Sequence, residues 1–168
     1  MTEAYIIDAA RTPRGIGKAG KGALSEFHPS RLLAKVFEGI GERNNLNTQD
    51  IDDVVVSCSS QVGKQGSCVG RMATLDAGWD TSASAVTLDR FCGSGITSVN
   101  LAAANIMSGM DDLCVAGDVW QALFALAGGE KVCVQCTKDS GCDQGLVWAT
   151  IDYRVLAWLT VQSASMSA

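Results

Sequence analysis

The sequence predicts an α/β protein with a mostly parallel mixed sheet and helices on both faces. Short apolar runs alternate with longer segments of helical periodicity. The chain has 18 glycines but only 2 prolines, which suits tight turns and few helix breaks. Strands that alternate with helices pair in parallel, because each connection must cross back over the sheet. With 168 residues, 47% of them hydrophobic, the chain is long enough to bury a core.

The expected elements follow one another through the first two thirds of the chain. Short apolar or β-branched runs predict four strands, at 4–9, 54–58, 85–88 and 113–116. Apolar residues spaced three or four apart predict three helices, at 29–43, at 67–77 and from just after residue 92 to about 110. The run 54–58 does not alternate, which indicates a strand buried on both faces. The strand at 113–116 is expected to end at Gly117.

The apolar spacing also predicts which face of each helix is buried. In the first helix the apolar face comprises Leu32, Leu33, Val36, Phe37 and Ile40. In the second helix the residues predicted to face inward are Cys68, Met72 and Leu75. In the third helix the predicted stripe comprises Ile96, Val99, Ala103 and Ile106.

Charge and polarity exclude several classes of function. Residues 91–110 carry no charge and are long enough for a membrane span, but their glycines, serines and asparagines favour a helix packed inside a soluble protein. A net charge of -5 leaves no basic surface for nucleic acid or an anionic membrane. The N-terminus lacks the basic segment of a signal peptide, so the seven cysteines are interpreted as reduced thiols of a cytoplasmic protein.

Cys92 is the candidate reactive residue. It is predicted to lie where a strand ends and a helix begins, the edge at which open α/β sheets usually bind ligands. The positive end of a helix dipole favours a thiolate, but fast chemistry still needs a nearby base. Position alone leaves two readings open, a reactive thiol and a buried structural cysteine.

Several short motifs follow the order found in a known family. They are Ala10–Pro13, Gly-Arg-Met-Ala at 70–73, Asp-Arg-Phe-Cys-Gly-Ser-Gly at 89–95, and the helical runs 98–104 and 106–109. On these motifs, residues 1–117 resemble the N-terminal half of a thiolase, an acetyl-CoA acetyltransferase. The Cys-Gly-Ser-Gly element distinguishes thiolases from the related ketoacyl synthases, which have a different pattern of small residues after their cysteine.

The resemblance implies an acetyl-CoA C-acyltransferase of fatty acid metabolism. Cys92 would take an acyl group from acyl-CoA, and a second acetyl-CoA would attack the acyl-enzyme to form 3-ketoacyl-CoA; the reverse reaction cleaves it. A backbone N–H at the helix start is expected to hold the developing oxyanion. The resemblance implies coenzyme A thioesters as substrates, no metal or other cofactor, and a homodimer or higher oligomer that pairs through the strand at 84–89. The substrate-binding residues are not assigned.

The resemblance stops at Gly117-Asp118-Val119-Trp120, where the family has a Gly-Gly segment with a nearby glutamate and methionines. The family's second half supplies a histidine, a second cysteine and an asparagine to the site, and none of those motifs occurs here. The only histidine, His28, is interpreted as a loop or cap residue. This chain alone is therefore expected to be impaired. The alternative is a non-catalytic fragment that at most binds CoA or a partner subunit.

Residues 118–168 form a divergent tail without family resemblance. Cys133, Cys136 and Cys142 have some of the spacing of a zinc site, but a fourth ligand is missing, so no metal is expected. Residues 131–135 alternate like an edge strand, whereas 145–161 fit either a strand pair or a helix. The abrupt change suggests the hypothesis of a shifted reading frame, which translation of the coding DNA in the other frames would test.

Overall fold

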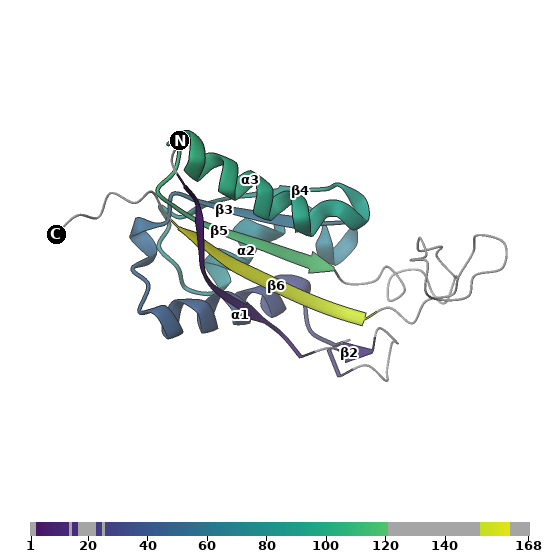
Figure 1. Ribbon diagram of the computed structural model, residues 1–168. Helices are drawn as coiled ribbons and strands as arrows, with labels where there is room; N and C mark the ends of the chain where they lie inside the picture. Colours follow the sequence, from purple (N-terminus) through teal and green to yellow (C-terminus); the bar gives the residue numbers. More distant parts are fainter. Residues whose placement is uncertain (1–2, 14, 17–22, 25, 121–151, 162–168) are drawn as a thin grey trace. The chain divides into compact units, whose positions relative to one another are not determined.

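The computed structural model describes residues 3–13, 15–16, 23–24, 26–120 and 152–161 (Figure 1). The chain forms two compact units. The larger comprises Met1–Pro13, Phe27–Trp120 and Arg154–Ala168, and the smaller comprises Arg14–Glu26 and Gln121–Tyr153. In the smaller unit, strand β2 (Gly15–Ile16) pairs antiparallel with the first two residues of β6. The other strands and the helices belong to the larger unit, except for the first two residues of β6.

The order of strands and helices agrees with the order that the sequence predicts. The strands are β1 (Tyr5–Arg11), β3 (Asp53–Cys58), β4 (Ser84–Leu88), β5 (Leu113–Trp120) and β6 (Asp152–Val161). The helices are α1 (Pro29–Asn44), α2 (Val69–Asp76) and α3 (Ser94–Ser108), with short 3-10 turns η1 (Thr48–Asp50), η2 (Gly63–Gln65) and η3 (Phe91–Gly93). The predicted end of the fourth strand at Gly117 is wrong. Strand β5 continues because Val119 still pairs with β3 and Trp120 with β6.

The sheet is mixed, as predicted, with β1, β3, β4 and β5 running in one direction and β6 in the other. Its strand order is β1-β6-β5-β3-β4 (Figure 1). Strand β3 pairs parallel with β4 and β5, whereas β6 is antiparallel to both β1 and β5. Residues 152–161, for which the sequence left strand or helix open, form a single strand between β1 and β5. The predicted strand at 131–135 lies outside the described residues.

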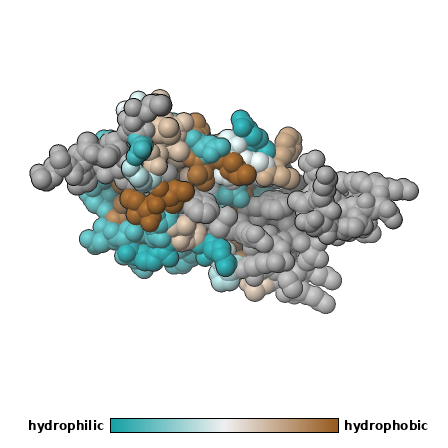
Figure 2. All heavy atoms as spheres, viewed as in Figure 1, coloured by the Kyte–Doolittle hydropathy of each residue, from teal (hydrophilic) through white to brown (hydrophobic). Residues whose placement is uncertain are grey.

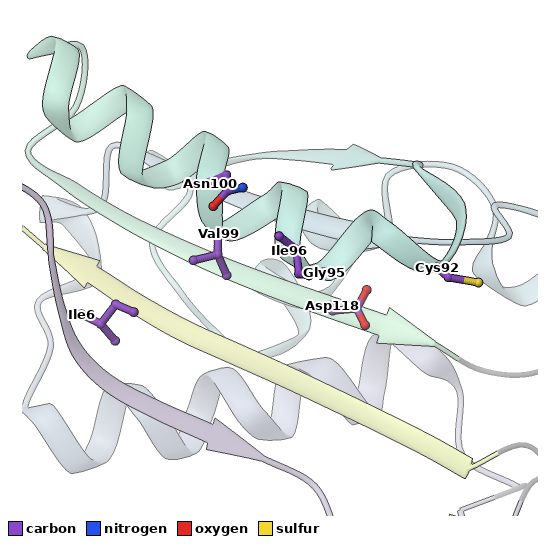
Figure 3. A pocket seen from close by; sticks show the side chains of 7 residues that line it. All are labelled: Ile6, Cys92, Gly95, Ile96, Val99, Asn100 and Asp118. Atoms are coloured by element: carbon purple, nitrogen blue, oxygen red, sulfur yellow. The ribbon is translucent and has the colours of Figure 1, made fainter. Parts of the chain in front are cut away.

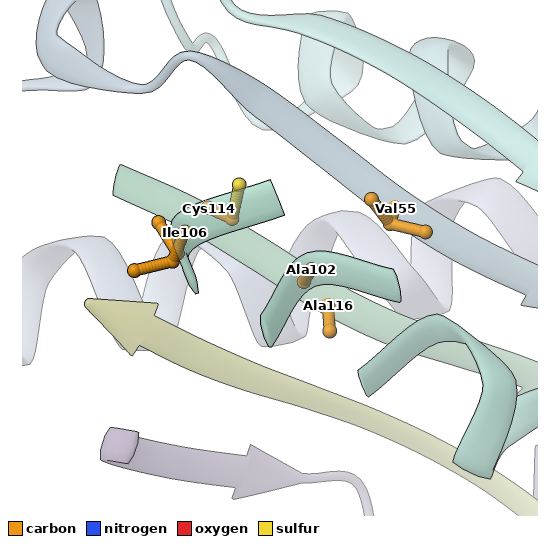
Figure 4. Close-up of a cluster of buried hydrophobic side chains, with 5 residues drawn as sticks. All are labelled: Val55, Ala102, Ile106, Cys114 and Ala116. Carbon is orange, nitrogen blue, oxygen red and sulfur yellow. The ribbon is translucent and has the colours of Figure 1, made fainter. Parts of the chain in front are cut away.

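Helices cover both faces of the sheet. Helix α3 lies on one face, and α1 and α2 lie on the other (Figure 1). On the α3 side, Val55 and Ala116 pack with Ala102 and Ile106 of the helix (Figure 4). The alternate residue Val56 points to α2, where a side chain on Gly70 would come within 3.0 Å of it. Strand β3 is therefore buried on both faces, which confirms the prediction from its unbroken apolar run.

Helix α1 buries the face that its sequence predicts. The predicted residues Leu32, Leu33, Val36, Phe37 and Ile40 are all buried. The Phe37 ring stacks on Trp79 with 4.7 Å between ring centroids. Pro29 occupies the first turn, and His28 is the N-cap residue, with its Nδ1 atom 2.7 Å from the Ser30 hydroxyl. His28 is thus a cap residue, as expected.

Helix α2 buries a different face from the predicted one. Met72 and Leu75 are exposed and Cys68 is half-buried, whereas the buried residues are Val69, Gly70, Ala73 and Thr74. The physical reason is the distance to the sheet. Gly70 approaches Val56 and the Val86 carbonyl so closely that only small side chains fit on that face.

Helix α3 also departs from the prediction. Its buried residues are Ser94, Ser98, Ala102 and Ile106, and of the predicted stripe only Ile106 is fully buried. Ile96 is 72% exposed. The Ser98 hydroxyl donates to the Gly95 carbonyl at 2.8 Å, so its burial leaves no polar group without a partner. Small residues let α3 lie close to the sheet, and its larger apolar side chains are left on the outer side.

The outward surface over α3 and β1 is rich in apolar side chains (Figure 2). The exposed large apolar side chains on β1 and α3 are Tyr5, Ile6, Ile7, Ile96, Leu101 and Met107. Among the helices that the structure describes, none has both the length and the apolar character that crossing a membrane requires.

Candidate functional site

Cys92 lies at the junction between a strand and a helix, as its sequence position predicts. Strand β4 ends at Leu88, the turn η3 spans Phe91–Gly93, and α3 begins at Ser94. The Cys92 side chain is exposed. Of the two readings that the sequence left open, the buried structural cysteine is therefore wrong.

Hydrogen bonds hold the turn that carries Cys92. The Ser94 hydroxyl accepts from the Arg90 N–H at 2.7 Å and donates to the Phe91 carbonyl at 2.6 Å. The Asp89 carboxylate accepts from the Phe91 N–H at 2.8 Å, and the Ser59 hydroxyl donates to the Phe91 carbonyl. Phe91 has a φ of 48°, a conformation that a bulky residue adopts only where its surroundings impose it. These contacts keep the backbone on both sides of Cys92 in place.

The backbone amides that follow Cys92 are engaged inside the turn. The Gly93 N–H donates to the Arg90 carbonyl at 3.0 Å, and the Ser94 N–H donates to the Phe91 carbonyl. An N–H that is already bonded in this way is not aimed at a ligand. The oxyanion donor expected at the start of the helix is therefore neither of these two amides.

An open cleft of about 370 Å³ lies beside Cys92 (Figure 3). It is lined by residues from β1, η3, the N-terminal half of α3 and the end of β5: Ile6, Cys92, Gly95, Ile96, Val99, Asn100 and Asp118. Three of these residues have branched apolar side chains, and the other three side chains carry a thiol, an amide and a carboxyl. Such a lining suits an apolar group oriented by a few polar contacts.

Sequence reasoning missed Asp118 as a site residue. Alternate residues of a strand share a face, so Asp118 points to the same side as Cys114 and Ala116, which pack under α3. Asp118 is in register with Ser57 of β3, and their side chains are hydrogen-bonded. The sequence feature that could have pointed to Asp118 is a carboxylate in an otherwise apolar strand.

The carboxyl of Asp118 is half-buried and packs closely against the helix. A Cβ atom on Gly95 would lie 3.3 Å from the Asp118 Cγ atom, so the absence of a side chain there makes room for the carboxyl. Burial raises the pKa of Asp118 above its ordinary value, and the hydrogen bond from Ser57 opposes that rise. Burial acts in this direction because it penalises the charged form.

The other described thiols are poorly placed for chemistry. Burial raises the pKa of the Cys58 thiol, and it also raises the pKa of Cys114, which lies 3.0 Å from the Asp111 carboxylate. Cys68 is half-buried between α2 and β4. Cys133, Cys136 and Cys142, considered for a zinc site, lie outside the described residues. Within the described part of the chain, no three or more metal-ligating residues come together.

Comparison with known proteins identifies the family. The model of the thiolase N-terminal domain matches residues 4–120. The chain belongs to the thiolase family. It is 41% identical over 119 residues to a steroid 3-ketoacyl-CoA thiolase of Mycobacterium tuberculosis, covering 71% of this chain and 28% of that protein. It is 43% identical over 120 residues to a 3-oxoadipyl-CoA/3-oxo-5,6-dehydrosuberyl-CoA thiolase of Escherichia coli, covering 71% of this chain and 29% of that protein.

A solved structure supports the thiolase fold. The crystal structure of the Bacillus anthracis acetyl-CoA acetyltransferase matches with a TM-score of 0.66 and 25% identity, over 86% of this chain and 35% of that one. The predicted fold class, a thiolase-like N-terminal half, is therefore confirmed. The chain spans 28% and 29% of the length of the two curated thiolases named above.

Proposed function

We propose that Cys92 is the nucleophile of a thiolase-type acyl transfer and takes an acyl group from acyl-CoA. The observation that supports this most is the exposed thiol at an open, mostly apolar cleft, on the sheet edge where α/β folds bind ligands. The thiol can be reached from solvent, and the apolar lining suits an acyl group. The proposed substrates are coenzyme A thioesters, with no other cofactor.

The proposed reaction has two balanced steps. The Cys92 thiol loses its proton, its sulfur forms a bond to the thioester carbonyl carbon, and coenzyme A leaves as a thiolate that takes up a proton. A second acetyl-CoA then loses a proton from its α-carbon, and the carbanion attacks the acyl-cysteine. Cys92 leaves as a thiolate that takes up a proton, and the product is 3-ketoacyl-CoA. The reverse direction cleaves 3-ketoacyl-CoA. This makes the proposed activity that of an acetyl-CoA C-acyltransferase.

The names of the relatives support a 3-ketoacyl-CoA thioester as the substrate class. We propose the same class for this chain, in fatty acid metabolism. Among the strands that the structure describes, β4 lies at one edge of the sheet and pairs only with β3, so we propose its other side as the surface through which two copies associate. We also propose that the protein is located in the cytoplasm.

A second function is favoured by one observation, the position of the only histidine. His28 caps α1 beside Ser30 and is not among the residues that line the cleft, so the described part of the site holds no imidazole base. A thiolase fragment that binds coenzyme A or a subunit without catalysis is therefore the alternative.

Incubation with acetyl-CoA, followed by intact-mass and peptide analysis, tests the proposal. The wild-type chain should gain one acetyl group on Cys92, and Cys92→Ser should gain none. Cys68→Ser, which removes a half-buried thiol elsewhere, is the matched control and should label like the wild type. Cleavage of acetoacetyl-CoA would support full turnover. Binding of coenzyme A without any label on Cys92 would favour the non-catalytic alternative.

For residues 118–168, we propose a divergent tail joined to the thiolase-like segment 1–117, with a shifted reading frame as its origin. The test is translation of the coding DNA after the Gly117 codon. A thiolase-like continuation in another frame would support this origin, and its absence from both other frames would end the hypothesis.

A further inference from the structure

The backbone directly before Cys92 is strained, and packing of the strained residue does not explain why. Phe91 has a φ of 48°, in the left-handed region that a bulky residue rarely adopts. Such a conformation persists only where the surroundings impose it. The Phe91 side chain is 78% exposed, so packing does not impose it. Hydrogen bonds to the Phe91 backbone therefore hold the turn that carries Cys92 (Figure 3).

Within the described part of the chain, the Phe91 carbonyl accepts three hydrogen bonds. Two come from Ser94, whose hydroxyl lies 2.6 Å away and whose N–H also donates. The third comes from the Ser59 hydroxyl at 2.8 Å. The Phe91 N–H in turn donates to the Asp89 carboxylate at 2.8 Å. Since the Phe91 carbonyl belongs to the same peptide group as the Cys92 nitrogen, these bonds fix the plane of that peptide.

Ser59 differs from the other two partners because it belongs to a distant part of the chain. Asp89 and Ser94 lie within three residues of Phe91 and move with the turn. Ser59 lies 32 residues earlier, directly after the inner strand β3. Of the hydrogen bonds described for the turn η3, only the Ser59 bond comes from outside residues 89–97. Ser59 therefore ties the turn to the end of a buried strand.

We propose that Ser59 is a positioning residue, whose hydroxyl anchors the turn to β3 and so sets the place of the Cys92 thiol for acyl transfer. This proposal rests on the proposed function of Cys92. Acyl transfer needs the sulfur to meet the thioester carbonyl carbon at a defined distance and angle, and a misplacement of about 1 Å can cost about 100-fold in rate. Ser59 is half-buried and Phe91 is exposed, so removal of the hydroxyl leaves no deeply buried polar group without a partner. The loss should therefore change the reaction more than the stability of the fold.

The test compares Ser59→Ala with Ser59→Thr, which keeps the hydroxyl. Mass spectrometry follows the acetylation of Cys92 over a range of acetyl-CoA concentrations. In Ser59→Ala the maximal rate should be about 2- to 10-fold lower than in the wild type, the factor that corresponds to one hydrogen bond. The half-saturating acetyl-CoA concentration should not change, because Ser59 does not line the cleft. Ser59→Thr should restore the wild-type rate, and Ser60→Ala, which removes the neighbouring hydroxyl, is the matched control and should react like the wild type.

A second measurement tests the turn without catalysis. The Gly93 N–H donates to the Arg90 carbonyl inside the turn, so its hydrogen exchange reports how firmly the turn is held. Exchange at Gly93 should be about 2- to 10-fold faster in Ser59→Ala than in the wild type, and unchanged in Ser60→Ala. The urea midpoints of both variants should agree with that of the wild type, which would exclude a general loss of stability as the cause.

The outcomes separate the two proposals. Equal acetylation rates in the wild type and Ser59→Ala would overturn the role of Ser59 and leave Cys92 as the nucleophile. A Ser59→Thr variant as slow as Ser59→Ala would also overturn that role. So would a Ser59→Ala variant that does not fold by circular dichroism, because the hydroxyl would then serve the whole fold. No acetylation of the wild-type chain, with normal alkylation of Cys92 by iodoacetamide, would overturn the proposed function and with it the positioning role.

Discussion

Helices α1 and α3 pack against opposite faces of the same sheet, but they bury different kinds of side chain. Helix α1 buries large apolar residues, including Leu33, Phe37 and Ile40. Helix α3 buries Ser94, Ser98 and Ala102 together with Ile106, and it leaves Ile96 and Leu101 exposed. The comparison shows that apolar spacing predicts the buried face only where the helix stands far enough from the sheet for large side chains to fit between them.

The two helices also differ in role: α1 supports the sheet, whereas α3 carries residues that line the cleft beside Cys92. The close approach of α3 brings Gly95 against the Asp118 carboxyl and leaves Ile96 and Val99 to line the cleft. A helix held off the sheet by large residues would not allow that contact. The small residues of α3 therefore serve both the packing and the geometry around Cys92.

The largest difference in stability is expected between two variants, one at a phenylalanine of α1 and one at a phenylalanine beside Cys92. Phe37 in α1 is fully buried and stacks on Trp79, whereas Phe91 beside Cys92 is 78% exposed. Phe37→Ala should lower the free energy of unfolding by about 3–5 kcal/mol, because it removes buried surface and leaves a cavity. Phe91→Ala should change it by no more than about 0.5 kcal/mol. Urea denaturation followed by circular dichroism measures both, and similar losses for the two variants would contradict the buried and exposed assignments.

A smaller effect is expected within α3 itself. Ser98 is fully buried against the sheet. Ser98→Leu should destabilise the protein by about 1–3 kcal/mol, because the extra side chain must displace the helix or the strand below it. Ile96→Ser on the outer side should be within about 0.5 kcal/mol of the wild type. Thermal melts compare the two variants. A stabilising Ser98→Leu, or a large loss in Ile96→Ser, would mean that the apolar stripe predicted from the sequence is the buried one after all.

The smallest effect concerns the attachment of α1 to β1 and depends on pH. The Asp8 carboxylate accepts hydrogen bonds from Asn44 at 2.7 Å and from Arg43, and these lower the pKa of Asp8 below its ordinary value. The unfolded chain binds this proton at higher pH than the folded chain does. The contact therefore stabilises the fold above the unfolded pKa, and the stability is lost as the pH falls through the folded pKa.

Asp8→Asn should thus be less stable than the wild type at neutral pH, with the difference shrinking below about pH 4 as the wild-type carboxyl takes up its proton. Parallel urea titrations at several pH values measure the difference. A difference that is constant from neutral to acid pH would rule out the charged contact as its cause.

Much of the fold follows from local sequence pattern. The unbroken run 54–58 correctly predicts a strand buried on both faces, and the spacing from Leu32 to Ile40 correctly predicts the inner face of α1. The predicted position of Cys92 at a strand-to-helix junction is also confirmed. These features depend on residues that are close together in the chain, where periodicity and hydrophobicity act directly. The nucleophilic role of Cys92 stays a prediction.

The tertiary structure alone decided which distant residues meet. Ile6, Gly95 and Asp118 come from three different elements, and the cleft exists only because the sheet and α3 bring them together. The strand at 152–161 could not be told from a helix by its own sequence, and its place between β1 and β5 depends on backbone pairing with both. The buried faces of α2 and α3 depend on how closely each helix approaches the sheet. That distance is set by contacts such as Gly70 on Val56, which no pattern within a single helix contains.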